Sequence, residues 1–394
     1  MKNEQKGCAA TPSTKSGGIF YFEDDHRDRA ARYTVKYGVA FKRGGTKYIS
    51  ELIQKGIDDG TRTATITGNW DIESHIRIPS DFTLIFDGCY LKMADTTFDN
   101  MFVNEHHNTE IGRTISGTDK NIRLIGKNGA IIDGGTYNGL SEYNQNKEGR
   151  PSIRLNVLIS FTNVDGFEVT GLKIHNFRWW AFCSLYCQNG HIHDIDFKAD
   201  DTCIDKDGNV YHGLSLDLYY DMHVKQADGI DIRRGCHDIV IEDIRGFAGD
   251  DLVALTCLDG SDLKNYSVEG MPDDLCNITV RNINGCALDA CVRILCQGNS
   301  TLHDVLIDGV CDMSDKISGI NGRGLQAIRL GDSHILYGSD LGEGDKCYNI
   351  TVKNVRSRAV YAMYFGGKPI KNLVYENIET FDDGGYIDNH WETN

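Results

Sequence analysis

The sequence predicts an all-β solenoid: a single-stranded, right-handed parallel β-helix with a short capping helix near its N-terminus. The first observation behind this prediction is a motif that recurs along the 394 residues. In this motif an apolar residue, one spacer, a second apolar residue and two spacers precede a third apolar residue. Its copies begin at Ile122, Phe167, Gly190, Ile239, Ile278, Val305, Ile350 and Leu373.

The spacing of these copies is the second observation. Successive copies start 45, 23, 49, 39, 27, 45 and 23 residues apart, which corresponds to one or two turns of about 22–25 residues plus inserted loops. Short strands at such a period indicate stacked coils, in which each apolar residue lies over its equivalent one turn later. Parallel crossovers are right-handed by default. The regular leucines and helical halves of a leucine-rich repeat are missing from the sequence.

Three segments before the repeat differ from it in composition or in the period of their apolar residues. Residues 1–18 are polar and rich in glycine, serine and threonine, which is typical of a flexible tail. Apolar residues then follow a helical period in 47–57, so a helix is expected to cover the open apolar end of the first coil. From 76 to 93 apolar and polar residues alternate, as they do in strands. We therefore expect residues 19–394 to form one domain.

Composition excludes several kinds of partner. The formal net charge of −16 argues against nucleic acid or an anionic membrane surface, and no run approaches the roughly 18 apolar residues of a membrane helix. The 13 cysteines contain no CxxC pair, which favours buried free thiols in a reducing compartment over a disulfide framework. No apolar signal region is visible at the N-terminus. We therefore expect a cytoplasmic location, or secretion if a signal has been removed.

Three aspartates lie where strands of the repeat begin, in the stretch from Ala227 to Cys257. Asp228 and Asp250 are 22 residues apart, about one turn, and Asp251 follows directly. On neighbouring coils these carboxylates would lie side by side, with the long segments 199–226 and 257–275 as flanking loops. Carboxylates within reach of each other cannot all ionise freely, so one of them keeps a proton. A proton-donating carboxylic acid beside a carboxylate is what hydrolysis of a glycosidic bond needs.

The order of these motifs resembles that of the polygalacturonase-type glycoside hydrolases, family 28 of the pectin lyase-like β-helix superfamily, over roughly residues 35–380. NIRLIGKNGAIIDGG resembles an early coil of that family, ADGIDI stands where the family has Asn-Thr-Asp-Gly, and AGDDLVAL where it has Gly-x-Asp-Asp. The resemblance implies that Asp250 is the general acid. It implies that Asp228 and Asp251 together hold and activate the water.

The sequence departs from the family at two positions of the site. The family's Gly-His-Gly is absent from ALDACVRILCQG, where Cys291 or Arg293 occupies the region. Arg329 matches the arginine of the family's Arg-Ile-Lys, but Gly331 replaces the lysine, so half of the clamp for an acidic sugar is missing. Arg293 could hold a carboxylate instead, or pair with Asp250 or Asp251 and tune them. A neutral or differently branched sugar is therefore an open alternative.

Other residues are candidates for contacts with the sugar. His334 could restore an imidazole to the site, or lie on the surface. Trp180, with its neighbour Trp179, and Tyr220, with Tyr219, could stack on sugar faces, although one tryptophan could equally pack in the core. The segment DKDGN has its glycine at the wrong position for a calcium loop of the EF-hand type. We expect no metal and no cofactor.

The sequence thus predicts a hydrolase for a glycosidic bond in a pectin-like or related plant-derived oligosaccharide or polysaccharide, acting with inversion and from one end of the chain. One alternative is a polysaccharide lyase on the same scaffold, for which Arg293 is the only good candidate base. The other alternative is a carbohydrate-binding β-helix without activity, which the missing histidine and lysine would permit.

Overall fold

The computed structural model of the chain describes residues 38–95, 97, 99–135, 157–177, 180–198, 202–205, 209–212, 222–224, 227–259, 266–313, 323–336, 338–342, 344–381 and 384–391. The tail predicted at 1–18 and the aromatic candidates Trp179, Tyr219 and Tyr220 lie outside the described residues, as does the centre of DKDGN.

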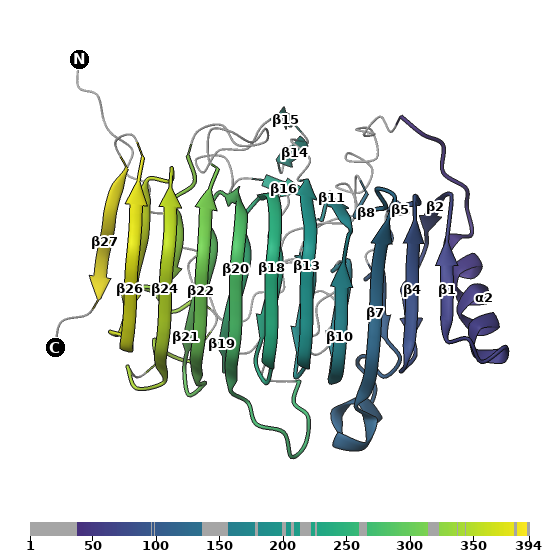
Figure 1. Cartoon of the computed structure of the whole chain (residues 1–394), viewed down its shortest axis with the longest axis horizontal. Helices are drawn as coiled ribbons and strands as arrows, with labels where there is room; N and C mark the ends of the chain where they lie inside the picture. Colours follow the sequence, from purple (N-terminus) through teal and green to yellow (C-terminus); the bar gives the residue numbers. More distant parts are fainter. Residues whose placement is uncertain are drawn as a thin grey trace.

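The described strands form a right-handed parallel β-helix, whose coils follow one another from helix α2 to β27 (Figure 1). Sheet A consists, in spatial order, of β1 (Thr63–Ile66), β4 (Phe82–Asp87), β7 (Asp119–Lys127), β10 (Val164–Thr170), β13 (Gln188–Lys198), β18 (His237–Ala248), β20 (Leu275–Ala287), β22 (Leu302–Asp312), β24 (Cys347–Ser357) and β26 (Lys371–Thr380). Sheet B consists of β3 (Ile76–Ile78), β6 (Phe102–Asn104), β9 (Ile159–Thr162), β12 (Trp180–Leu185), β17 (Asp228–Arg233), β19 (Asp251–Leu258), β21 (Ala290–Gln297), β23 (Gln326–Leu330), β25 (Tyr361–Gly367) and β27 (Gly385–Trp391). The predicted fold class is confirmed.

Shorter elements complete the coils. Four strands pair along a branch of sheet A: β2 (Asn69–Ile72), β5 (Tyr90–Met93), β8 (Ile131–Asp133) and β11 (Lys173–His175). A separate antiparallel sheet contains β14 (Thr202–Asp205), β15 (Val210–His212) and β16 (Met222–Val224). Two 3-10 turns, η1 (Ile111–Arg113) and η2 (Ile115–Gly117), lie between β6 and β7.

The sequence motif corresponds to sheet A. The first residues of its eight copies pair with one another in a continuous parallel register, from Ile122 in β7 through Phe167 in β10 to Leu373 in β26. Most of the motif's apolar residues are buried, and β20, for example, buries Ile278, Val280 and Ile283. The copies therefore stack in register although their spacing in the sequence varies, as expected for coils that carry inserted loops. A loop inserted between strands leaves the stacked core intact.

A left-handed backbone residue turns seven of the eight motif copies between the second and third apolar positions. Asn354, at φ 58°, is one example; its amide donates to Asp308 at 2.7 Å, and its Oδ1 accepts from Asn377 at 3.1 Å. Asparagine, aspartate and glycine adopt this conformation at little cost, whereas it costs most residues about 1–2 kcal/mol. Seven copies have such a residue: Gly171, Asp194, Asp243, Asn282, Gly309, Asn354 and Asn377.

Helix α2 (Gly45–Asp58) covers the first coil, as predicted (Figure 1). Its residues Ile49 and Ile53 are buried in the core, and Tyr48 stacks on Trp70 with ring centroids 4.3 Å apart. At the other end of the solenoid β26 is mostly exposed, and Val374 remains 52% accessible. The core is thus sealed at the helix end and partly open at β26.

The described cysteines all carry free thiols, and most of them are buried. This agrees with the prediction of buried thiols instead of a disulfide framework. None of the helices in the described ranges has the length and apolar character needed to cross a membrane.

Candidate active site

The three predicted catalytic aspartates meet where two neighbouring strands of sheet B begin. Asp228 is the first residue of β17 and Asp251 the first of β19, and Ile230 pairs with Val253 in the parallel register. The backbone N–H of Asp251 donates to Oδ1 of Asp228 at 3.0 Å. Asp250 directly precedes β19, and one carboxylate oxygen of each aspartate lies within 4.8 Å of the others. The coil spacing therefore places the three carboxylates together, as expected.

Burial controls the charge state of this aspartate cluster. Burial raises the pKa of the Asp228 carboxyl well above its ordinary value, and the neighbouring charges of Asp231, Asp250 and Asp251 raise it further. Burial also raises the pKa of Asp251 well above its ordinary value, although the Arg293 guanidinium opposes the shift. Asp250 is the half-buried member of the cluster. The cluster therefore retains protons at a pH where exposed aspartates have lost theirs.

The raised pKa of Asp228 predicts how stability depends on pH. Because the folded state holds the Asp228 proton more tightly than the unfolded chain does, ionisation above the unfolded pKa of about 3.9 lowers the free energy of unfolding. We expect Asp228→Asn to raise the free energy of unfolding at pH 7 by about 1–2 kcal/mol. The gain should shrink as the pH falls towards about 4, where wild-type Asp228 is protonated.

Urea unfolding of both proteins between pH 4 and 8 measures this difference. Asp243→Asn is the matched control, because Asp243 lies on sheet A and Asn282 donates to its carboxylate from the next strand. A destabilisation of Asp228→Asn that is the same at every pH would contradict the electrostatic interpretation.

Two arginines lie beside the aspartates and are bound by carboxylates. Arg293 in β21 donates from Nη1 to Asp251 at 3.2 Å and to Asp289 at 3.1 Å, and from Nη2 to Asp332 at 3.0 Å. Arg329 in β23 donates to Asp289 at 2.9 Å and to Asp332 at 2.7 Å. Both arginines and all three carboxylates are largely buried. The five side chains form one arginine–carboxylate network.

This network bears on the two roles considered for Arg293. Arg293 pairs with Asp251, as the second alternative required, and its role towards a substrate stays a prediction. Arg329 is held in place in addition by Tyr364, whose ring centroid lies 4.4 Å from the guanidinium carbon. Asp289 and Asp332 are not among the site residues predicted from the sequence. Their signal was local: Asp289 lies four residues before Arg293, and Asp332 three residues after Arg329.

The predicted sugar platform Trp180 lies at the start of β12, next to the strand of Asp228. Only 4% of its surface is exposed, and the guanidinium of Arg233 covers the ring at 3.8 Å. Arg233 in turn donates to Asp231, which is fully buried. In this arrangement the indole packs within the wall of the site, and a sugar could stack on it only after Arg233 moved.

His334 lies at the rim of the arginine–carboxylate network. Its side chain is 68% exposed, and Nδ1 is 3.9 Å from Oδ1 of Asp332. The backbone N–H of His334 donates to the same oxygen at 3.3 Å. The position suits contact with a sugar at the edge of the site and equally suits a surface histidine, so its role stays a prediction.

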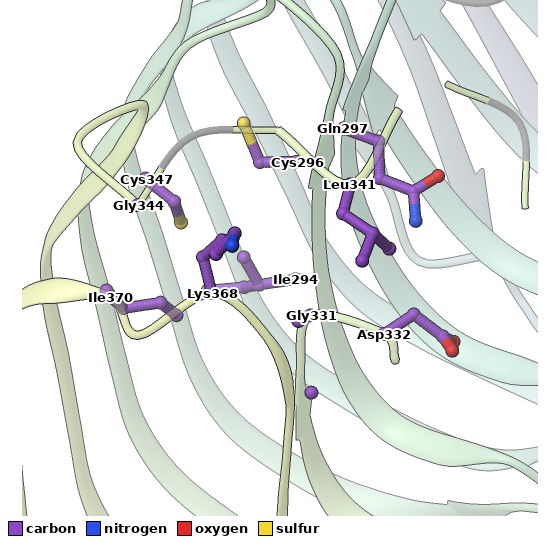
Figure 2. A pocket seen from close by; sticks show the side chains of 12 residues that line it. Ile294, Cys296, Gln297, Gly331, Asp332, Leu341, Gly344, Cys347, Lys368 and Ile370 are labelled. Carbon is purple, nitrogen blue, oxygen red and sulfur yellow. The ribbon is translucent and has the colours of Figure 1, made fainter. Parts of the chain in front are cut away.

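A small cavity is lined in part by Asp332 of the network (Figure 2). Its volume is about 20 Å³, which is enough for one water molecule and far too small for a sugar ring. Among the residues that line it, Asp332 points its carboxylate away from Lys368 in Figure 2, and that carboxylate binds Arg293 and Arg329. A cavity of this size is not the sugar-binding site.

Two groups of described side chains have the spacing of metal ligands. They are the aspartate cluster and a second group on sheet A that contains Glu168, His191 and His193. An all-carboxylate set suits a hard cation such as Ca²⁺ or Mg²⁺, whereas mixed nitrogen and oxygen donors suit Zn²⁺. Acidic clusters occur commonly without an ion, and the chemistry of the aspartate cluster can be derived without one.

The parallel β-helix also appears in the structures to which the chain is similar. A 1,3-alpha-1,4-beta-D-galactose-4-sulfate-3,6-anhydro-D-galactose-2-sulfate 4 galactohydrolase aligns with a TM-score of 0.57 and 13% identity, over 91% of this chain and 93% of that protein. An iota-carrageenase of family GH82 from A. fortis aligns with a TM-score of 0.55 and 12% identity, over 91% and 92%. A tailspike protein of E. coli bacteriophage HK620 aligns with a TM-score of 0.54 and 14% identity, over 93% and 64%.

These structures share the parallel β-helix fold with the chain. At such identities the similarity concerns the fold. No protein-family model matches the chain, and no curated protein matches it. Membership of the polygalacturonase family remains a prediction from the motifs.

Proposed function

We propose that the protein hydrolyses a glycosidic bond in a pectin-like or related plant-derived glycan, at the aspartate cluster of sheet B. The observation that carries this proposal is the convergence of Asp228, Asp250 and Asp251, whose carboxylate oxygens lie within 4.8 Å of one another. A buried, partly protonated set of carboxylates provides both the acid and the base that the reaction needs.

The three aspartates have different access to a substrate. Asp250 is half-buried, whereas Asp228 and Asp251 are 8% and 3% exposed. We assign Asp250 as the general acid, because the leaving oxygen must approach the proton donor from solvent. Asp228 and Asp251 then share the attacking water. Oδ1 of Asp251 has no hydrogen-bond partner among the described side chains and is a suitable acceptor for that water.

The tight spacing of the cluster bears on the stereochemistry. Inverting enzymes separate acid and base by about 6.5–9.5 Å, and the oxygens here approach more closely than that. Rotation of Asp250 towards a bound sugar would lengthen its separation from the buried pair. Without that rotation the spacing is nearer the roughly 5–5.5 Å of retaining enzymes. We propose inversion, with the attacking water held by the buried pair, in line with the expectation from the sequence.

The arginine–carboxylate network favours a neutral sugar next to the bond. Arg293 and Arg329 would be the cations to hold a uronic acid or a sulfate, but each already binds Asp289 and Asp332. Across the described side chains of the site, carboxylates outnumber arginines, so an anionic sugar would be repelled. We therefore propose that the substrate is a neutral glycosyl residue of such a glycan.

The lyase alternative would require Arg293 to accept a proton. Burial lowers the pKa of its guanidinium, but the charges of Asp251, Asp289 and Asp332 outweigh burial and raise the pKa well above its ordinary value. A guanidinium held in this way keeps its proton and cannot act as a base. The observation favours hydrolysis over elimination.

Product release from a panel of neutral and uronic-acid oligosaccharides tests the proposal. We expect reducing ends from neutral substrates, at rates at least about a hundredfold above those from polygalacturonate, with the inverted anomer seen first by NMR. An unsaturated product that absorbs in the ultraviolet would show a lyase. Binding to the same sugars without turnover would show a carbohydrate-binding protein and overturn the proposal.

A further inference from the structure

A second cluster of titratable side chains lies on the outer face of sheet A, away from the aspartate cluster. The sequence GHIHDIDF in β13 places His191 and His193 two residues apart, so both imidazoles lie on the same face of the strand. The rings stack with centroids 4.0 Å apart. Glu168 of β10 pairs in register with His191, and Glu242 of β18 pairs with His193. Three adjacent strands thus contribute two imidazoles and two carboxylates.

The contacts within this histidine–glutamate cluster run diagonally. Nε2 of His193 donates to Glu168 at 3.2 Å, and Nε2 of His191 donates to Glu242 at 2.7 Å. All four side chains are partly buried, with 15–41% of each exposed. Ligand atoms of Glu168, His191 and His193 lie within 4.8 Å of one another. Nε2 of His193 is thus directed at Glu168 on β10, and its proton lies between two of the donor atoms that a cation would join. Nε2 of His191 is directed at Glu242, on the other side of β13.

A surrounding set of contacts orients these donors. Nδ1 of His193 donates to Asp194 at 2.9 Å, which leaves Nε2 directed at Glu168. The second oxygen of Glu168 accepts from Arg123 at 2.7 Å, and that of Glu242 accepts from Arg281. A carboxylate on the far nitrogen of a histidine is the usual outer support of a metal-ligating imidazole.

We propose that Glu168, His191 and His193 form a binding site for a divalent transition-metal ion of the zinc type, with Glu242 beside it. Two neutral imidazoles and one carboxylate match the donor preference of Zn²⁺. In a tetrahedral zinc site the donor atoms lie about 3.3 Å apart, so the two stacked rings must turn until each directs one nitrogen at the ion. The ion would cross-link β10 and β13, and thus two successive coils. This inference is independent of the proposed function.

Binding should compete with protons. Burial lowers the pKa of His193, but its hydrogen bonds to Asp194 and Glu168 outweigh burial and raise it. The pKa of Glu168 is lowered. Burial raises it, but the hydrogen bonds and charges of Arg123 and His193 together outweigh burial. Because the metal would replace the proton on Nε2 of His193, its binding should release protons to the solvent.

Zinc titration of the full chain by calorimetry, in two buffers of different ionisation enthalpy, tests the site. We expect one equivalent of Zn²⁺ to bind at pH 7.5 with release of protons. His193→Ala should weaken binding at least about a hundredfold, and Asp194→Asn about 10–100-fold. His303→Ala is the matched control, because His303 also pairs with an adjacent aspartate, Asp304, on sheet A and should leave the affinity unchanged.

Cobalt spectroscopy separates this site from the protein's cysteines. Co²⁺ bound by nitrogen and oxygen lacks the intense near-ultraviolet charge-transfer band of thiolate ligation. We expect visible bands without that charge-transfer band, lost in His193→Ala and kept in His303→Ala. Equal binding by both variants, or a thiolate spectrum, would overturn the proposal and leave the histidine–glutamate cluster as a network of ion pairs.

Discussion

Replacing Asp250 by asparagine is expected to lower kcat/KM at least about a hundredfold, because amides cannot supply the proton that the leaving oxygen needs. The fold should tolerate the change. The backbone carbonyl of Asp250, which accepts the N–H of Asp289 at 3.0 Å, is unaffected, and the side chain is only half-buried. We therefore expect the free energy of unfolding to change by less than about 1 kcal/mol. Initial rates and urea unfolding measure the two quantities.

The leaving group distinguishes the acid from the residues that hold the water. A glycoside with an acidic phenol as leaving group needs little protonation, so the loss in Asp250→Asn should shrink on that substrate. In Asp251→Asn the loss should be similar on both substrates, because water activation is needed in each. Asp243→Asn, on the opposite sheet, should keep the wild-type rate. An Asp250→Asn enzyme within threefold of wild type would show that Asp250 is not the acid.

The fold could be predicted because the stacking of apolar residues between coils, its largest energetic requirement, produces a regular pattern in the sequence. Apolar residues of every coil must stack on those of the next, and the eight motif starts from Ile122 to Leu373 do align in register. The spacer residues carry a second signal that the prediction did not use. Asparagine, aspartate and glycine recur before the third apolar position because the backbone there is left-handed, as at Asn282 and Asn354.

The candidate site was predictable only in part. Asp228 and Asp251 could be placed together because they begin adjacent coils. The partners of Arg293 were predictable to different degrees. Asp289 lies four residues before Arg293, so the sequence contained a local signal for that pair. The contact between Arg293 and Asp332 joins residues 39 positions apart, and the length of an inserted loop decides which residues meet across coils. Pairing rules within a coil do not contain that information, so this contact became visible only in three dimensions.

Replacing Arg293 by methionine is expected to have the largest effect on stability. The substitution would leave the buried carboxylates of Asp251, Asp289 and Asp332 with one arginine, Arg329, in place of two. Removing one partner from a buried ion pair costs about 3–5 kcal/mol, because the remaining charge stays desolvated. We expect a loss of that size in urea unfolding at pH 7. Arg356→Met is the control: the Arg356–Glu379 pair is exposed, and losing it should cost at most about 1 kcal/mol.

The size of this loss should depend on pH and on Asp251. Without this guanidinium, burial and the charges of Asp289 and Asp250 are opposed only by Arg329, so the pKa of Asp251 rises further. The variant then loses more stability than wild type as rising pH ionises the carboxylates, and the two proteins converge in acid. If Arg293→Met does not fold at pH 7, unfolding at about pH 5 and the Arg293→Lys variant keep the comparison possible.

Adding Asp251→Asn to Arg293→Met should restore about 1–3 kcal/mol, since it removes a carboxylate that has lost its partner. A double variant with the simple sum of the two single effects would show that the contact between Arg293 and Asp251 contributes nothing to the fold.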